Sequence, residues 1–206
     1  MKIILLILGI AVAVTLWRNQ AVKPTILPVQ QSDKILALGD SLTYGYGAAT
    51  QESYPAVLSA MTGLKIINAG INGETSSEGL RRLPALLGDT HITHMILCFG
   101  GNDILQKLPR TQLKKNLKQM IEIAKGRGVK VLLVSVPDIG ILGLSALDLY
   151  EEVADETDTP LLSGALAEIL SDPRLKSDQV HPNAEGYRVL AERIEEKCRE
   201  MGWIGE

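Results

Sequence analysis

The residues best suited to chemistry are a serine near the start of the chain and an aspartate–histidine pair near its end. Ser41 follows the apolar run 35–38, and Asp178 lies three residues before His181. A serine hydroxyl needs a base before it acts as a nucleophile. In a tight loop, a carboxylate at this spacing can reach the imidazole Nδ1, fix its tautomer and stabilise the imidazolium. The three residues are therefore candidates for nucleophilic catalysis, although each motif alone is also compatible with turn or helix-entry chemistry.

Two further loops combine glycine with a hydrogen-bond donor. In Gly100-Gly101-Asn102, the glycines let the backbone approach a ligand closely, and Asn102 offers an amide donor. The segment 68–76 contains Gly73, which can turn a backbone N–H inward. Each loop alone is compatible with an ordinary turn. Glycine-bearing loops at the ends of three successive strands together favour a functional site.

The elements that position these loops alternate between strands and helices. Short apolar runs predict strands at Lys34–Leu38, Leu64–Asn68, Thr93–Phe99, Val129–Val136 and Pro160–Leu162. Apolar residues at helical spacing predict helices at Glu52–Met61, Ser76–Leu87, Thr111–Lys125, Leu147–Glu156 and Asn183–Met201. The alternation predicts an α/β fold, a three-layer α/β/α sandwich around a five-stranded parallel sheet. The expected flavodoxin-like strand order is 2-1-3-4-5, with its switch point between the first and third strands.

Composition excludes several classes of partner and cofactor. A net charge of −3 and 4% aromatic residues argue against nucleic acid as a partner. The two cysteines, Cys98 and Cys198, lack metal-ligand spacing and are expected as buried small hydrophobes, so we expect no metal and no cofactor. His91 and His94 come before the apolar residues of the third strand. We expect them near the opposite end of the sheet from Ser41, as surface or loop histidines.

The N-terminus differs in kind from the rest of the chain. Lys2 precedes an uncharged apolar run, Ile3–Trp17, which is followed by Arg18. We expect residues 1–18 to be an uncleaved anchor or a cleaved signal peptide, residues 19–33 to be a linker, and residues 34–204 to be one folded domain. The apolar run is short for a full span, so an anchor requires bilayer thinning or snorkelling.

The motifs above occur in the order and spacing of the GDSL/SGNH hydrolases, which this chain resembles over residues 34–201. The blocks that carry the resemblance are Gly39-Asp40-Ser41-Leu42, Gly73, Gly100-Gly101-Asn102-Asp103 and Asp178-x-x-His181-Pro182. Segments 68–76 and 79–87 are similar to the bacterial branch of periplasmic thioesterase I/lysophospholipases and arylesterases.

The resemblance implies a role for each site residue. Ser41 is the expected nucleophile, His181 the expected base, and Asp178 the residue expected to orient His181. The backbone N–H groups of Ser41 and Gly73, with the Asn102 side chain, are the expected oxyanion hole. The implied activity is hydrolysis of a small acyl ester or thioester, and the implied location is the periplasm. Segment 137–171 departs from the family pattern, which leaves the acyl length open.

Three alternatives compete with this hypothesis. Nucleotide binding is disfavoured because Gly45-Tyr46-Gly47 lacks a third glycine at the fingerprint spacing and no phosphate-loop motif occurs. A non-catalytic carbohydrate- or lipid-binding module on the same fold would not require the serine, histidine, aspartate and asparagine together. A polysaccharide O-acetylesterase requires a polar groove, whereas the residues that flank the motifs are apolar and favour acyl chains: Ile71, Ile104, Leu105, Ile139 and Ile141.

A basic surface is predicted on and around the helix 111–125. Its cations are Lys107, Arg110, Lys114, Lys115, Lys118, Lys125, Arg127 and Lys130, and Glu122 is the single acid among them. We interpret it as a solvated helix face, and an anchored protein can also rest this face on anionic lipid headgroups.

Overall fold

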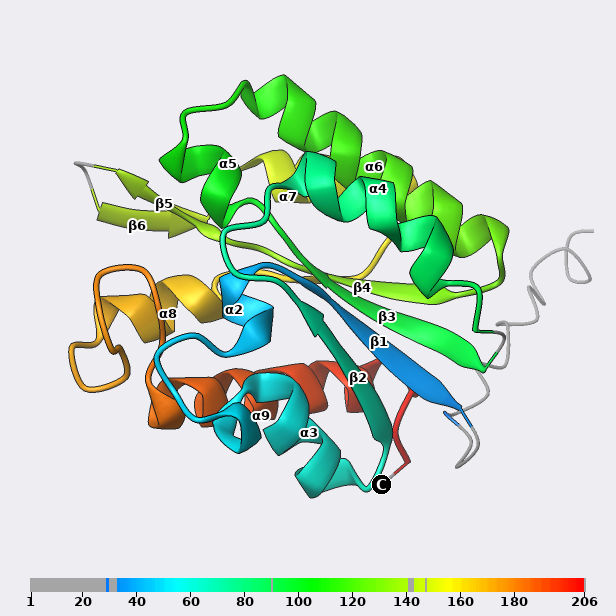
Figure 1. Ribbon diagram of the computed structural model, residues 1–206, viewed down its shortest axis with the longest axis horizontal. Helices are drawn as coiled ribbons and strands as arrows, with labels where there is room; N and C mark the ends of the chain where they lie inside the picture. Colours follow the sequence, from blue (N-terminus) through cyan, green and yellow to red (C-terminus); the bar gives the residue numbers. More distant parts are fainter. Residues whose placement is uncertain (1–28, 30–32, 90, 141–142, 147, 206) are drawn as a thin grey trace, which may run out of the picture.

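The computed structural model describes residues 29, 33–89, 91–140, 143–146 and 148–205, and its centre is a parallel sheet (Figure 1). The strands are β1 (Lys34–Gly39), β2 (Lys65–Gly70), β3 (Ile92–Cys98), β4 (Lys130–Val134) and β7 (Leu161–Leu162), in the order β2-β1-β3-β4-β7. Gly39 pairs with Gly70 on one side and with Cys98 on the other, so the carboxyl ends of three strands coincide. The predicted order of the five sheet strands is confirmed.

Helices cover both faces of the sheet. In Figure 1, α4 (Ser76–Leu86), α6 (Arg110–Gly126) and α7 (Asp148–Thr157) lie on one side, and α3 (Tyr54–Thr62) and α9 (Ala184–Glu200) lie on the other. Because both faces are covered, the central strands must be apolar on both sides. Leu36, Ala37 and Leu38 in β1 and Met95, Ile96 and Leu97 in β3 are fully buried. The predicted three-layer sandwich is confirmed.

Several short elements were not predicted from the sequence. Two short helices follow sheet strands directly, α2 (Ser41–Tyr44) after β1 and α5 (Gly101–Leu105) after β3. A 3₁₀ turn (Thr50–Glu52) precedes α3, which therefore begins later than expected. Strands β5 (Pro137–Gly140) and β6 (Gly143–Ala146) form a separate antiparallel hairpin, and α8 (Ala165–Ser171) follows β7. These last three elements occupy the segment that departs from the family pattern.

The prediction that His94 is a surface or loop histidine is wrong. His94 lies inside β3 and is only 3% exposed, with its ring 4.5 Å from that of Trp203 in an edge-on arrangement. Burial, with the nearby Lys130 charge, lowers the pKa of His94 to about 4. His94 pairs in register with Ile35, near the start of β1. It therefore lies near the end of the sheet opposite Ser41, as predicted. Exposed His91 fits its prediction.

The prediction that Glu122 is the single acid of the basic surface around α6 is also wrong. Lys114 pairs with Glu152 at 2.6 Å and with Glu156 at 2.7 Å, and Lys118 pairs with Glu156 at 2.6 Å. Both acids belong to α7, which packs beside α6 (Figure 1). The topology therefore brings compensating charges that the helix pattern alone does not reveal, and the solvated-face interpretation is favoured.

Both cysteines are buried and free, as expected. Among the helices that the structure describes, none is both apolar enough and long enough to cross a bilayer. The predicted anchor or signal segment, residues 1–18, lies outside the described residues, as does most of the linker 19–33.

Candidate active site

Ser41 stands at the point where β1 ends and α2 begins. Asp40 caps this short helix, because its Oδ1 accepts a hydrogen bond from the Leu42 N–H at 3.0 Å. A Cβ at Gly39 would lie 2.1 Å from the Thr43 hydroxyl oxygen and 2.4 Å from the Cys98 carbonyl oxygen. Only glycine fits this turn, which lets the chain leave the core abruptly and present Ser41 at the sheet edge.

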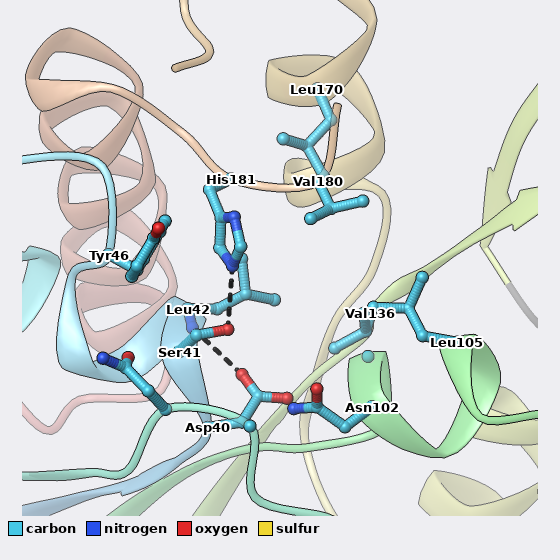
Figure 2. A pocket seen from close by; sticks show the side chains of 13 residues that line it. Asp40, Ser41, Leu42, Tyr46, Asn102, Leu105, Val136, Leu170, Val180 and His181 are labelled. Atoms are coloured by element: carbon cyan, nitrogen blue, oxygen red, sulfur yellow. Dashed lines mark hydrogen bonds between the residues drawn. The ribbon is translucent and has the colours of Figure 1, made fainter. Parts of the chain in front are cut away.

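His181 reaches Ser41 from the loop before α9. Its Nε2 lies 2.9 Å from the Ser41 Oγ (Figure 2). Its Nδ1 lies 2.8 Å from the Asp178 Oδ2. Asp178 Oδ1 also accepts the backbone N–H groups of Val180 and His181, at 2.8 and 2.9 Å. The structure thus brings together the three residues that the sequence singled out, in a continuous hydrogen-bonded chain.

The Asp178 carboxylate is held in its charged form. Partial burial raises its pKa, but the Val180 N–H and the His181 ring outweigh this effect, and the pKa of Asp178 lies below its usual value. A carboxylate that stays charged can fix the histidine tautomer with Nδ1 protonated, which leaves Nε2 free to accept the serine proton.

Gly73 and Asn102 line the same pocket as Ser41 and His181. Gly73 has a φ of 77°, a backbone conformation that favours glycine. Asn102 is the second residue of α5, and its Nδ2 donates to the Glu74 carbonyl at 3.0 Å. The sequence-predicted donors are therefore grouped around one cavity.

Buried contacts fix the loops that carry these donors. Gly100 has a φ of 132°, and a Cβ there would lie 2.1 Å from the Tyr150 hydroxyl, which donates to the Phe99 carbonyl at 2.7 Å. Asp103 is buried and accepts both the backbone N–H and the hydroxyl of Ser76, at 2.8 and 2.6 Å. The start of α4 is thereby tied to α5.

The pocket encloses about 210 Å³ and has one apolar wall. The apolar residues that line it are Leu42, Leu105, Val136, Leu170 and Val180 (Figure 2). Of the expected apolar flank, Leu105 is among the lining residues, whereas Ile71 is exposed and Ile104 packs against the core. The Ile139 side chain and Ile141 lie outside the described residues. Leu170 comes from the segment 137–171, where the sequence offered no family pattern to identify it, and Val136 is the last residue of the predicted fourth strand.

Two neighbours of the catalytic candidates were not predicted. The Tyr46 ring lies 4.6 Å from the His181 ring and lines the pocket. Asp40 is fully buried beside Ser41, and burial, with the charges of Asp103 and Glu74, raises its pKa to about 7 despite the Leu42 N–H bond. Both residues sit within short motifs already noted, but their burial and contacts depend on the tertiary fold.

Comparison with known proteins decides the family. Residues 37–189 match the model of the GDSL-like Lipase/Acylhydrolase family. The chain belongs to this family. It is 32% identical over 170 residues to the Thioesterase 1/protease 1/lysophospholipase L1 of Escherichia coli K12, covering 78% of this chain and 81% of that protein. It is also 32% identical over 176 residues to an arylesterase of Vibrio mimicus, covering 80% and 88% of the two chains.

Solved structures agree with the family assignment. The crystal structure of TesA matches with a TM-score of 0.73 at 27% identity, covering 82% of this chain and 99% of that one. The psychrotrophic esterase EstA of Pseudoalteromonas, in a structure inhibited by monoethylphosphonate, matches with a TM-score of 0.72 at 25% identity, covering 82% and 98%. The resemblance inferred from the motifs is confirmed, and family membership makes the chain a hydrolase of carboxylic esters.

Proposed function

We propose that this protein hydrolyses acyl esters or thioesters through an acyl-enzyme on Ser41. The observation that carries the proposal is the chain of hydrogen bonds from Ser41 Oγ through the His181 ring to Asp178, beside a pocket with an apolar wall. His181 takes the serine proton as Oγ attacks the carbonyl carbon, and then protonates the departing alcohol or thiol. A water molecule, deprotonated by His181, then attacks the acyl-enzyme, and His181 returns the proton to Ser41 Oγ as the bond to the acyl group breaks and the acid leaves.

The oxyanion that forms in each step needs donors already in place. We assign this role to the backbone N–H groups of Ser41 and Gly73 and to the Asn102 Nδ2. All three residues line the pocket. The Asn102 amide has two hydrogens and gives one to the Glu74 carbonyl, so the other remains available for the substrate. Such preorganised donors act only on the charge that develops in the transition state.

The apolar wall supports an acyl chain as the part of the substrate that enters the pocket. Thioesterase, lysophospholipase and arylesterase are the names of the relatives, and they share an acyl group as the chemical feature. A polysaccharide O-acetylesterase is the alternative, and it would require a polar groove in place of this wall.

Kinetic comparison tests the proposal. We expect turnover of nitrophenyl esters and matched thioesters within a series from acetyl to palmitoyl, little turnover of an acetylated glycan, and no turnover by Ser41→Ala. Turnover retained in a folded Ser41→Ala variant would refute the mechanism. Preference for the glycan would favour the O-acetylesterase.

We also propose that the domain faces the periplasm and that residues 1–18 hold it at the inner membrane. The support is Lys2 before the apolar run 3–17, with Trp17 and Arg18 at its end as an interfacial aromatic and a snorkelling cation. Membrane fractionation with N-terminal sequencing tests this. A soluble periplasmic protein that begins near Val22 would indicate a cleaved signal peptide.

A further inference from the structure

Arg82 joins the ends of two strands that lead to the proposed site, although it does not line the pocket with Ser41. It lies in α4, and its Nη2 donates to the Gly39 carbonyl at 3.2 Å and to the Ala69 carbonyl at 2.6 Å. Gly39 ends β1 directly before Asp40 and Ser41, and Ala69 belongs to the end of β2, which leads to Gly73. One guanidinium therefore contacts both chain segments that carry backbone donors.

Glu74 connects the same guanidinium to the remaining donor. Its carboxylate accepts the Arg82 Nε at 2.7 and 2.9 Å, and its side chain is only 7% exposed. The backbone carbonyl of Glu74 accepts the Asn102 Nδ2 at 3.0 Å. A path of direct contacts thus runs from Arg82 to each of the loops that carry Ser41, Gly73 and Asn102.

We infer that Arg82 and Glu74 are a positioning pair that sets the relative placement of the three oxyanion donors. The inference rests on the proposed function of those donors. The guanidinium offers several donors in a rigid planar fork, so it can hold two carbonyls and a carboxylate at fixed angles, which a lysine ammonium cannot do. The Gly39 carbonyl also accepts the Ile71 N–H at 3.2 Å, so the guanidinium adds to a contact that already joins the end of β1 to the segment after β2.

The pair acts on the transition state more than on substrate binding. Neither side chain lines the acyl pocket, so its loss should leave the apolar wall unchanged. A displacement of about 1 Å in positioned groups can cost about 100-fold in rate. We therefore expect Arg82→Gln to lower kcat about 100-fold while KM changes less than about threefold, because the displaced donors bind the oxyanion and not the ground state.

Two matched controls separate positioning from general destabilisation. Arg81→Gln changes the neighbouring, largely exposed arginine of the same helix and should leave kcat within about twofold. Asp89→Asn breaks a partly buried ion pair with Lys34, at the opposite end of β1. It should lower the melting temperature without lowering kcat.

Glu74→Gln is the second test of the pair, because it keeps the Glu74 carbonyl and the contacts of Arg82 with Gly39 and Ala69. If Arg82→Gln does not fold, Glu74→Gln alone tests the inference. A fall in the kcat of Glu74→Gln with little change in its KM supports the inference. A double variant that is no slower than Arg82→Gln alone also supports it, because the two residues then act as one unit. Wild-type kcat in folded Arg82→Gln, or in folded Glu74→Gln, would overturn the inference, as would fully additive losses in the double variant. Since Ser41→Ala is measured beside them, turnover that persists there would instead refute the proposed function.

Discussion

Within the part of the chain that the structure describes, the buried carboxyl of Asp40 forms no ion pair, and we predict how its substitution changes the pH dependence of stability. Its Oδ1 accepts the Leu42 N–H, while its Oδ2 is buried without a hydrogen-bond partner in the part of the chain that the structure describes. Burial raises its pKa from 3.8 to about 7. Between these values the folded protein holds a proton that the unfolded chain has released, so stability falls as pH rises through this window and then becomes constant.

Each pKa unit corresponds to about 1.4 kcal/mol. Between pH 5 and pH 7 the Asp40 carboxyl therefore costs about 3 kcal/mol of unfolding free energy, with no further loss above pH 7. Asp40→Asn cannot ionise, but it keeps a carbonyl oxygen for the Leu42 N–H. We expect the unfolding free energy of this variant, relative to wild type, to increase by about 3 kcal/mol from pH 5 to pH 9.

Urea unfolding, followed by the fluorescence of buried Trp203, measures this difference. Groups that titrate alike in both proteins cancel in the comparison. Asp172→Asn is a matched control, because the Arg174 side chain lowers the pKa of Asp172 to about 2. Its effect on stability should be constant from pH 5 to pH 9. A difference between Asp40→Asn and wild type that does not change with pH would refute the reasoning.

Two further predictions concern the proposed oxyanion donor Asn102 and the buried His94. Asn102→Ala should lower kcat by roughly 10²–10³ with little change in KM, because its amide is assigned to the transition state; the melting temperature should change little, and an equal fall in stability would favour a turn-only role. Because the pKa of His94 lies below its ordinary value of 6.5, wild type should lose stability as pH falls from 6.5 to about 4. His94→Phe should remove this loss in acid unfolding curves, and an unchanged acid limb would contradict it.

The site was predictable from the sequence because its chemistry lies at strand ends. Ser41, Gly73 and Asn102 follow apolar runs, and parallel strands bring their carboxyl ends to one edge. A loop that carries both Asp178 and His181 requires only local geometry to join them. Which of these residues lie together can therefore be inferred from the sequence alone.

What the sequence could not predict depends on contacts between distant segments. Helices α2 and α5 are too short for periodicity to identify them. His94 is buried because Trp203, near the end of the chain, packs on its ring. Lys114 and Lys118 of α6 form ion pairs because α7 lies beside it. Arg82 looks like an ordinary polar helix residue until the fold places two strand ends against its guanidinium.

The most direct test of the central claim is covalent trapping of the nucleophile. A fluorophosphonate, which forms a stable bond to an activated serine, is mixed with wild type and with Ser41→Ala, and the adduct is mapped by mass spectrometry of peptides. We predict a single adduct on the peptide that contains Ser41 and no adduct in Ser41→Ala. An adduct on another residue, or labelling that persists in folded Ser41→Ala, would contradict it.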